Sequence, residues 1–445
     1  MGTKKNKEFP KGLDETIVKE ISKIKKEPKW MLDFRLDSFK KFKNIKNPNW
    51  GPNLEDLDFQ DIRYYSTGAE KANTWEEIPT DIKQTFEKLG ISKEEQKLLA
   101  GISTQYESEV IYSQIKKKWN SLGIIFETTE LALKKYPELF KEYFAQLVPN
   151  SENKYAALNS AVWSGGTFIY IPKGLKLTMP VQTYFRINTQ NMGQFERTLI
   201  IADEGSEIHY IEGCTAPQYM TNSLHSAVVE VFVKKNAKVR YSTMQNWSKN
   251  IYNLVTKRSV VDENGTMEWV DCNIGSKVTM KYPGTILKGD NSKGTFLSLG
   301  LADEEQIMDS GSKMIHIGKN TKSIINSRTI SKQNGLSTYR GNCKITKNAK
   351  NSKSIISCDG LILDKKAKSY SYPTNEIQNK TSTIEHEAKI SKVSQNQLKY
   401  LKSRGLSEQE ASHLIVSGFV RPITEGLPME YAVELDRILD MFVEK

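Results

Sequence analysis

Turns recur at a nearly constant interval through the middle of this 445-residue chain. Each turn is a short polar segment, and the six markers are Gly205, Asn236, Asn264, Asn291, Asn320 and Asn348, which lie 31, 28, 27, 29 and 28 residues apart. Glycine and asparagine tolerate the left-handed backbone that tight turns need. A constant step of about 20–50 residues is typical of a repeat architecture. The spacing therefore indicates a fold built from stacked, similar units.

The stretches between these turns have the composition of β-strands. Short runs rich in Val, Ile, Thr and Tyr, such as residues 168–171, 198–201 and 228–233, are separated by small polar turns, and no long helical period survives. A β-sandwich would place its turns about 8–12 residues apart, whereas strand-only repeats with this longer step favour a parallel β-helix. We therefore expect a mainly β fold whose parallel β-helix core covers residues 151–388.

Helical patterns flank this region on both sides. Residues 1–150 are expected to form an N-terminal helical and irregular domain, and residues 389–445 a C-terminal helical domain. Signals for helix starts stand at Asp14, Pro28, Ser92 and Ser407, and Gly418 is the expected stop of the helix that Ser407 begins. The C-terminal helices would either cap the open end of the repeat stack or dock a partner, and the pattern leaves both open.

Composition excludes several classes of protein. Hydrophobic residues make up 38% of the chain and mean hydropathy is -0.54, with no run of about 18 apolar residues, so a membrane-spanning helix is not expected. The N-terminus has no pattern of a secretory signal or transit peptide. Four scattered cysteines are too few for a disulfide framework and favour a reducing compartment. The net charge of +11 suggests nucleic-acid binding, but lysine is spread evenly beside abundant Asn and Ile, as in proteins of AT-rich genomes.

The densest group of chemically active residues is Glu385-His386-Glu387. On a strand, both carboxylates would point to one side and the histidine to the other. Cys358 lies 29 residues before Glu387, about one repeat, so we expect the two side chains to share a column on adjacent coils, about 4.8 Å apart. A thiolate and a carboxylate suit iron or zinc. Two ligands are too few for a closed site, so the expected site is labile or is completed by another chain.

The other cysteines show a partial phase relation. Cys214 and Cys272 are 58 residues apart and Cys272 and Cys358 are 86 apart, about two and three repeats, whereas Cys343 is about half a repeat out of phase. These thiols are either ordinary buried residues of a β core or a line of reactive groups along one face, and spacing alone does not decide. The segment 357–360 lacks a nucleophile elbow, and the chain lacks a phosphate-binding P-loop motif, so ATP hydrolysis is not expected.

Several longer segments resemble one known family. They are Gln194–Leu199, Glu212–Pro217, Tyr241–Trp247, Val255–Arg258, Met314–Thr321, Ser357–Asp359 and Ile384–Ala388. These segments, in this order, are similar to the SufB/SufD family of scaffold proteins in the SUF iron–sulfur cluster assembly system, from about Gly12 to the final helix. The resemblance implies a right-handed parallel β-helix between N-terminal and C-terminal helical domains. It also implies a non-catalytic scaffold and a transient iron–sulfur cluster; whether a reduced flavin binds is not decided by the sequence.

The resemblance also implies roles for individual residues. Cys214 matches the cysteine that accepts persulfide sulfur, and Cys358 matches the cysteine where the cluster forms. Glu385, His386 and Glu387 match the group near that site, with Glu387 as the expected ligand and metal contact beside Cys358. The residues that match the internal sulfur path are Arg186, Asn188, Gln245, Trp247 and Lys257.

The resemblance implies partners as well. The remaining cluster ligand would come from the paralogous subunit SufD, and the C-terminal helices would dock the ATPase SufC. A cysteine desulfurase and its sulfur-transfer partner would supply sulfur. The expected location is the bacterial cytoplasm, or the plastid stroma if the gene is organelle-encoded. Cys272 departs from many relatives and is expected to be an inert core thiol. Two alternatives remain: a β-helix carbohydrate-active enzyme and a basic nucleic-acid-binding protein.

Overall fold

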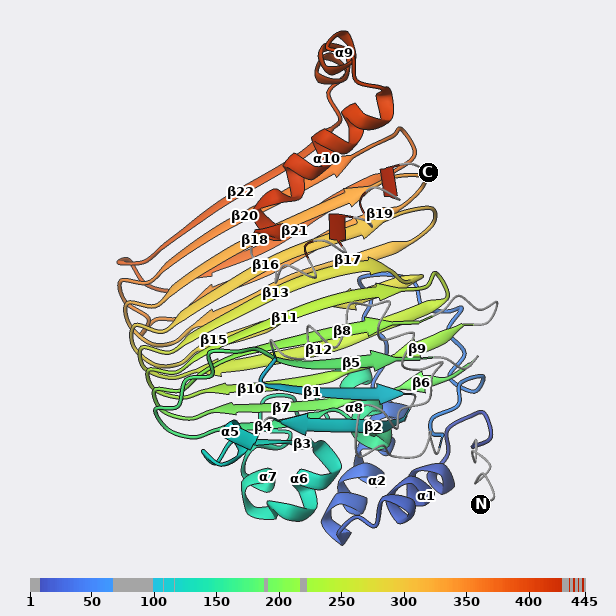
Figure 1. The fold of residues 1–445 in the computed structure, drawn as a ribbon, viewed down its shortest axis with the longest axis vertical. Coiled ribbons are helices and arrows are strands. Elements are labelled where there is room, and N and C mark those ends of the chain that lie inside the picture. Colours follow the sequence, from blue (N-terminus) through green and yellow to red (C-terminus); the bar gives the residue numbers. More distant parts are fainter. Residues whose placement is uncertain are drawn as a thin grey trace.

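The protein is a two-sheet parallel β-solenoid (Figure 1). The computed structural model describes residues 9–66, 99–106, 108–115, 117–187, 191–216 and 222–425, together with residues 432, 435, 436, 439, 442 and 443. Each coil adds one strand to each sheet, and the two sheets face one another along the whole stack. The expected mainly β, parallel β-helix fold with helices at both ends is confirmed.

Ten strands form the first sheet. In spatial order they are β2 (Glu109–Ile115), β1 (Gly101–Tyr106), β5 (Val181–Arg186), β8 (Glu207–Thr215), β11 (Lys238–Trp247), β13 (Thr266–Gly275), β16 (Lys293–Ala302), β18 (Lys322–Ser331), β20 (Lys353–Ile362) and β22 (Thr383–Lys392). All neighbours in this sheet pair in parallel except β1 and β2, which are antiparallel.

The second sheet lies opposite the first. Its main path runs through β21 (Lys368–Ile377), β19 (Leu336–Ile345), β17 (Ile307–His316), β14 (Val278–Lys281), β12 (Ile251–Val261), β10 (Val228–Val233), β7 (Arg197–Ala202), β4 (Thr167–Ile171) and β3 (Ile125–Thr128). Three short strands join beside it, namely β15 (Gly284–Leu287), β6 (Gly193–Gln194) and β9 (Ser223–His225). From β15 to β22, each strand of one sheet is followed in the chain by a strand of the other.

The repeating turns have the backbone that the marker residues predict. The φ angles of Gly205, Asn236, Asn264, Asn291 and Asn320 are 69°, 58°, 57°, 59° and 56°. Two side-chain hydrogen bonds also link successive turns, because Asn264 Nδ2 donates to Asn236 Oδ1 (3.1 Å) and Asn291 Nδ2 donates to Asn264 Oδ1 (3.2 Å). The sixth marker is wrong by three residues, since Asn351 rather than Asn348 takes the left-handed conformation, with φ 57°.

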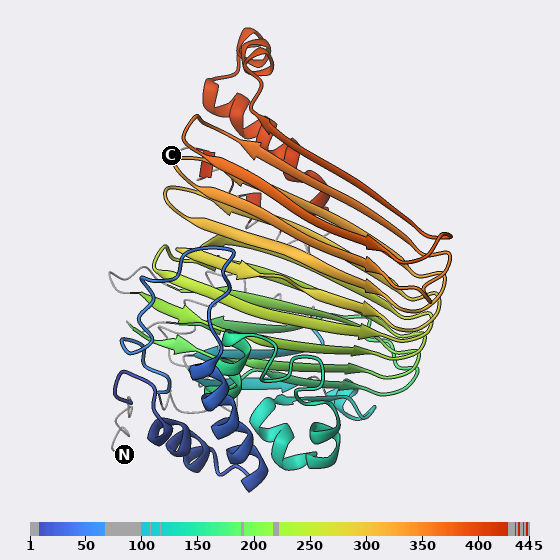
Figure 2. The same cartoon turned by 180° about the vertical axis from the view of Figure 1, so that it is seen from behind.

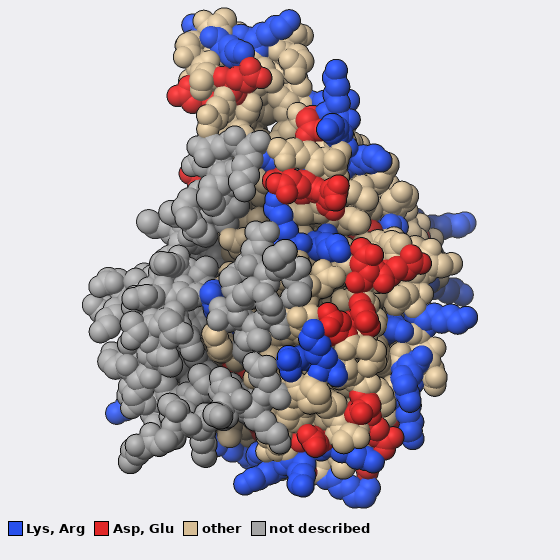
Figure 3. All heavy atoms as spheres, turned by 90° about the vertical axis from the view of Figure 1, so that its right-hand side faces the viewer, with Lys and Arg blue, Asp and Glu red and all other residues tan. Residues whose placement is uncertain are grey.

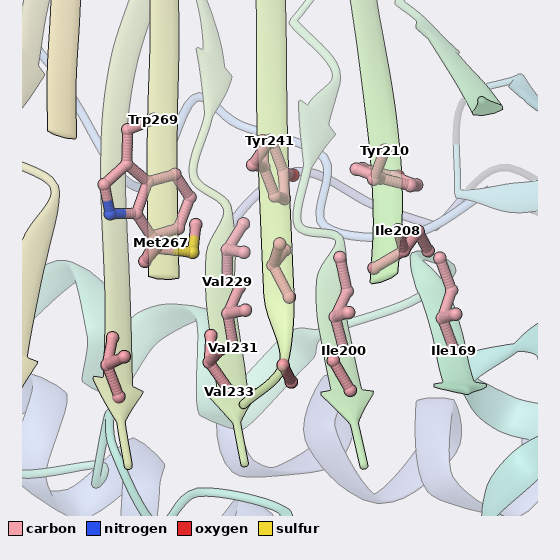
Figure 4. Packing of buried hydrophobic residues seen from close by; sticks show 14 of the residues in the cluster. Ile169, Ile200, Ile208, Tyr210, Val229, Val231, Val233, Tyr241, Met267 and Trp269 are labelled. Atoms are coloured by element: carbon pink, nitrogen blue, oxygen red, sulfur yellow. The ribbon is translucent and has the colours of Figure 1, made fainter. Parts of the chain in front are cut away.

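The core fills the space between the two sheets. Figure 4 shows side chains from successive strands aligned in rows, with Ile169, Ile200 and Val231 contributed by neighbouring coils. Tyr210 and Tyr241 lie 4.8 Å apart between ring centroids, and Tyr241 lies 5.1 Å from Trp269. Because equivalent positions repeat from coil to coil, the inner faces of the two sheets pack into one continuous core along the stack.

The N-terminal helices pack against the first coils (Figure 2). They are α1 (Glu15–Lys25), α2 (Lys29–Asn44), α5 (Lys117–Asn120), α6 (Thr129–Lys135), α7 (Pro137–Tyr143) and α8 (Lys154–Val162). Asp14 caps α1 and Pro28 precedes α2, as predicted, whereas Ser92 lies outside the described residues. The prediction of helix and irregular structure up to residue 150 is incomplete, because β1, β2 and β3 lie there. Pairing with the first coils decides their strand conformation.

The C-terminal helix α10 lies across the outer face of the first sheet (Figure 1). After α9 (Gln395–Ser403), a capping box at Ser407 begins α10 (Glu408–Thr424) as predicted. The predicted stop at Gly418 is wrong, because α10 continues through it. Val416, Val420 and Ile423 of α10 pack with outward-facing side chains such as Leu299 and Leu301, and burial of this apolar face keeps the helix regular beyond Gly418. Within the described residues, no helix is both long and apolar enough to cross a membrane.

Candidate functional site

Cys214 lies inside the solenoid, one residue before the end of β8. Its side chain is 4% exposed. The thiol Sγ donates to Glu212 Oε1 at 3.8 Å, and Gln245 Nε2 donates to Sγ at 3.8 Å. Glu212 and Cys214 are two residues apart on one strand and so share the inner face, while Gln245 is the direct register partner of Cys214 on β11. The thiol is therefore held between a carboxylate and an amide donor.

Four oppositely charged side chains continue this polar interior. Lys257 Nζ lies 3.5 Å from Glu212 Oε1 and 3.8 Å from Asp271 Oδ1, and Lys281 Nζ lies 2.9 Å from the same Asp271 oxygen. All four side chains are buried. Two cations therefore balance two carboxylates, which is the arrangement that makes buried charges tolerable.

Burial controls the protonation of these groups. It raises the pKa of the Cys214 thiol well above its ordinary value, and Glu212 and Glu196 add to the rise, while Lys257 and Lys281 oppose it. Burial also lowers the pKa of Lys281 to about 8, against the raising effect of Asp271. At neutral pH the resting Cys214 is therefore a protonated thiol, and it needs a proton acceptor before it can act as a nucleophile.

A second chain of buried hydrogen bonds fixes the amide of Gln245. His225 contacts Glu196 Oε1 through Nε2 (2.5 Å) and Asn253 Oδ1 through Nδ1 (2.8 Å). Asn253 Nδ2 donates to Gln245 Oε1 at 2.8 Å, and Lys281 Nζ donates to the same oxygen at 3.3 Å. Because Gln245 Oε1 has two donors, its Nε2 must face Cys214. The ring of Trp247 covers His225, with 4.7 Å between the centroids.

Sequence reasoning missed several of these interior residues, namely Glu196, Glu212, His225, Asn253, Asp271 and Lys281. Glu212 was detectable, because it precedes Cys214 by two residues and alternation in a strand places both on one face. The partners of Lys257 and Gln245 were not detectable, because they come from strands whose register is set by coil length.

A column of polar side chains leads from Glu212 toward Cys358. Successive register partners along the first sheet are Glu212, Thr243, Asp271, Ser298, Ser327 and Cys358. The hydroxyls of Ser298 and Ser327 are 3.3 Å apart. Five strand steps separate β8 from β20, and at about 4.8 Å a step the column spans about 24 Å. The interior therefore offers a continuous polar line between the surroundings of the two cysteines.

Cys358 is buried near the last coil. Its exposure is 3%, and it shares the inner core with Tyr339, whose side chain forms a hydrogen bond with it. Burial raises the pKa of the thiol to about 12. The Tyr339 hydroxyl also lies 3.2 Å from Ser312 Oγ. A hollow of about 10 Å³ borders Cys358, Tyr339 and Tyr370, which is at the lower limit for one water molecule.

The expected column of Cys358 and Glu387 is wrong by one residue. Cys358 pairs with Ala388, and Glu387 pairs with Ser357. The coil from β20 to β22 therefore contains 30 residues rather than the expected 29, and a shift of one residue directs a side chain to the opposite face of a strand. Glu385 and Glu387 accordingly face outward and are exposed, and Glu385 pairs with Lys353 at 2.7 Å.

His386 is on the other face of β22, as the alternation predicts. It pairs with the buried Ile356, its Nδ1 lies 3.0 Å from Asn375 Nδ2, and its Nε2 is buried without a hydrogen-bond partner within the described residues. Of the three residues of this group, His386 is thus the one that shares the inner face with Cys358.

The strand register places the other two cysteines, Cys272 and Cys343, in different parts of the fold. Cys272 pairs with Met244 and Leu299, so it points to the outer face and packs in the apolar cluster under α10. Cys343 lies on β19 of the second sheet and belongs to the inner core. Cys214 and Cys358 share the inner face in columns two residues apart. A single line of three thiols is therefore wrong, because Cys272 is displaced by one residue.

The residues of the expected internal path divide in a similar way. Gln245, Trp247 and Lys257 are buried in the interior near Cys214. Arg186 pairs with Thr215, the neighbour of Cys214, so the register directs it to the outer face. Asn188 lies outside the described residues. Across the part of the chain that the structure describes, no three His, Cys, Asp or Glu side chains gather closely enough to hold a metal ion.

Comparisons with known proteins point to one system. Residues 185–419 match the family model described as SUF system FeS cluster assembly, SufBD core domain, and residues 18–183 match the model of the SufBD protein N-terminal region. An iron–sulfur cluster assembly SufBD family protein of Staphylococcus aureus (strain MRSA252) is 57% identical over 435 residues, which is 98% of this chain and 94% of the relative. The iron–sulfur cluster assembly protein SufB of Bacillus subtilis (strain 168) is 56% identical over the same shares.

Proposed function

Because this chain belongs to the SufB/SufD family of the SUF iron–sulfur cluster assembly system, we propose that it is the scaffold subunit of that system. In this proposal Cys214 accepts persulfide sulfur, the sulfur moves through the solenoid interior from Cys214 to Cys358, and a labile cluster forms at Cys358. The observation that carries the proposal is the polar column that connects the surroundings of these two cysteines inside the solenoid.

The surroundings of Cys214 suit a persulfide. A persulfide is a reactive sulfur carrier that must be kept from water and stray thiols, and Cys214 is almost fully buried. Gln245 already donates toward the sulfur. Among the described residues, Trp247 Nε1 and Asn273 Nδ2 are buried donors without an acceptor, and Asn273 is the next residue after Gln245 in the Cys214 column. These donors would stabilise the negative charge of a terminal sulfur.

The Cys358 end suits a site completed from outside the chain. Cys358 and His386 face the interior of the last coils, while Glu385 and Glu387 lie on the outer face of β22. We propose that Cys358 is the anchor of the nascent cluster. Glu387 remains the proposed carboxylate ligand, but in this register it faces outward, so it reaches the same iron only if β22 rearranges or the cluster sits at a subunit interface.

The ends of the chain support the proposed partners. Among the described residues, β21 and β22 are the terminal strands of their sheets, so their outer edges offer backbone groups with which a second solenoid such as SufD could pair. Helix α9 stands beyond the last coil in Figure 1, where the ATPase SufC would dock. A cysteine desulfurase and its sulfur-transfer partner would load Cys214. The chain itself would act as a non-catalytic scaffold in a reducing compartment, the cytoplasm or a plastid stroma.

The visible charge does not favour the nucleic-acid alternative. On the face shown in Figure 3, Lys and Arg side chains alternate with Asp and Glu side chains rather than forming one basic patch. A nucleic-acid-binding protein would concentrate positive charge along one surface. The family matches also favour cluster assembly over carbohydrate chemistry.

The test is a comparison of cysteine variants in the complete complex. The chain is expressed with SufC, SufD, the desulfurase and the sulfur-transfer partner, and iron and sulfide are measured in the purified complex. Cys214→Ala and Cys358→Ala should lose at least tenfold in cluster yield. Cys272→Ala is the matched control, because Cys272 is equally buried but faces the outer side, and it should keep the wild-type yield. An unchanged yield in Cys358→Ala would refute the assembly site.

Two further variants test the carboxylate and the histidine. If Glu387 is a ligand, Glu387→Gln should lower iron content while persulfide still forms at Cys214. If His386 on the inner face is the ligand instead, His386→Ala should lower the iron content and Glu387→Gln should leave it unchanged. Reconstitution with and without reduced flavin tests whether that cofactor takes part.

A further inference from the structure

We propose that Glu212 is the proton acceptor for Cys214: its carboxylate removes the thiol proton as Cys214 takes sulfur from a persulfide donor. This inference rests on the proposed role of Cys214 as the sulfur acceptor. It adds the residue that converts a resting thiol into a nucleophile.

The hydrogen-bond directions around the sulfur assign this role. Gln245 Nε2 donates to Sγ, because both Asn253 Nδ2 and Lys281 Nζ occupy the amide oxygen of Gln245. The hydrogen of the thiol therefore cannot point to Gln245. It points to Glu212 Oε1, which lies 3.8 Å from Sγ. A carboxylate accepts protons and has no hydrogen of its own to donate when ionised.

The groups that face Glu212 come from four strands. Cys214 and Tyr210 lie on its own strand, Tyr241 on β11, Lys257 on β12 and Lys281 on β14. Tyr241 OH donates to Glu212 Oε2, and Lys257 Nζ lies 3.5 Å from Oε1. The carboxylate is thus held on both oxygens, and Oε1 is the oxygen that contacts the sulfur.

The lysines are less suited to the same task. Lys257 Nζ is directed to Thr243 Oγ1 (2.7 Å) and Glu212. Lys281 Nζ is directed to Asp271 (2.9 Å), Asn273 Oδ1 (3.1 Å) and Gln245. An ammonium that is donating to these acceptors stabilises negative charge near the sulfur but has no free electron pair to take a proton.

The transfer step balances without an oxidant or a reductant. The S–H bond of Cys214 breaks and its proton moves to Glu212, leaving a thiolate. The thiolate attacks the terminal sulfur of the donor R–S–SH, so a new S–S bond forms on Cys214 and the S–S bond of the donor breaks. The electron pair of the broken bond stays on the donor sulfur, and the proton on Glu212 is returned to this leaving thiolate. The products are R–SH and a persulfide on Cys214.

The experiment measures the rate of persulfide formation on Cys214 in the complete complex. A sulfur-transfer partner loaded with persulfide is mixed with the complex, and the alkylated Cys214 peptide is followed by mass spectrometry. General base catalysis contributes about 10²–10⁴-fold, so Glu212→Gln should slow the reaction at pH 7 by at least about 10²-fold. Because solvent is then the only base, the rate of persulfide formation in Glu212→Gln should also rise about tenfold per pH unit, more steeply than the rate of the wild type.

Glu230→Gln is the matched control. Glu230 is another buried carboxylate with a cationic partner, Arg197 at 2.9 Å, but it accepts from the backbone N–H groups of Ala145 and Val148 and is not part of the cluster around Cys214. The rate of persulfide formation in this variant should stay within a few-fold of the wild type, with the same pH dependence. A loss in Glu230→Gln as large as in Glu212→Gln would show that removing any buried carboxylate slows the reaction, and it would overturn the specific role of Glu212.

The outcomes separate this inference from the proposed function. If the wild-type chain gains no sulfur at Cys214, the proposed function fails. If the wild type is loaded and Glu212→Gln is loaded equally fast with an unchanged pH profile, the proton-acceptor role alone is overturned. If Glu212→Gln does not fold, Glu212→Asp carries the test: a rate lowered about tenfold with the wild-type pH profile supports the role, and an unchanged rate refutes it.

Discussion

Replacing Lys257 by methionine tests whether the charges inside the solenoid compensate one another. Lys257 lies between Glu212 and Asp271, at 3.5 and 3.8 Å, and all three side chains are buried. The substitution keeps much of the apolar stem but leaves two carboxylates with one remaining cation, Lys281. Breaking a buried pair by removing one partner costs about 3–5 kcal/mol, because the other charge stays uncompensated.

The loss should be local, because each coil contacts mainly its neighbours. Hydrogen exchange followed by mass spectrometry measures the stability of each coil separately. A loss of about 3–5 kcal/mol corresponds to about 10²–10³-fold or more in amide protection, and it should appear in β8, β11 and β13 before β18 and β20. Lys238→Met is the control, since Lys238 is on β11 but exposed, and it should cost less than about 1 kcal/mol.

A double variant completes the test. In Lys257→Met/Glu212→Gln, the Asp271–Lys281 pair at 2.9 Å stays balanced. We therefore expect this variant to be more stable than the sum of the two single changes predicts, with a coupling energy of about 0.5–3 kcal/mol. If Lys257→Met costs no more than Lys238→Met, or if the coupling is zero, the argument that these buried charges stabilise one another is wrong.

Three further predictions follow from individual contacts. Burial lowers the pKa of His316 to about 4, so between pH 6.5 and 4 the unfolded chain binds more protons than the folded chain, and the folded state loses stability as the pH falls. This residue should account for a loss of about 2 kcal/mol in unfolding free energy from pH 7 to 5. Denaturant unfolding of His316→Gln at both pH values should show a loss that is smaller by this amount. Burial raises the pKa of Cys358 to about 12, so its alkylation by iodoacetamide, followed by mass spectrometry, should keep rising from pH 7 to 10 without levelling near 9; a plateau near pH 9 would contradict this. Asn264 has a left-handed backbone, with φ 57°, and its side chain forms hydrogen bonds to the two neighbouring turns. Asn264→Ala should lower the unfolding free energy by about 1–2 kcal/mol, and by more than Asn264→Gly does. Equal losses in the two variants would show that the left-handed backbone is not the cause.

The coil-to-coil register shows why part of the candidate site was not predictable. The step between turns in the sequence is 27–31 residues, so it identifies a repeat but does not fix the phase of any one coil. Glu387 was expected beside Cys358, yet one additional residue in the last coil places Ala388 there. The same one-residue difference moves Cys272 out of the interior. In a strand, an error of one residue reverses the direction of a side chain.

The sequence by itself determined the properties that depend on local chemistry. The Asn and Gly turns, the β-branched runs between them and the alternation of Glu385, His386 and Glu387 follow from backbone preferences and from the two-residue period of a strand. Only the tertiary structure decided which side chains meet. Glu212 of β8 meets Lys257 of β12, which lies 45 residues further along the chain, and His225 reaches Gln245 through Asn253. These contacts form because neighbouring coils stack and the two sheets face each other. Such contacts depend on the exact length of every turn between them, which no local pattern encodes.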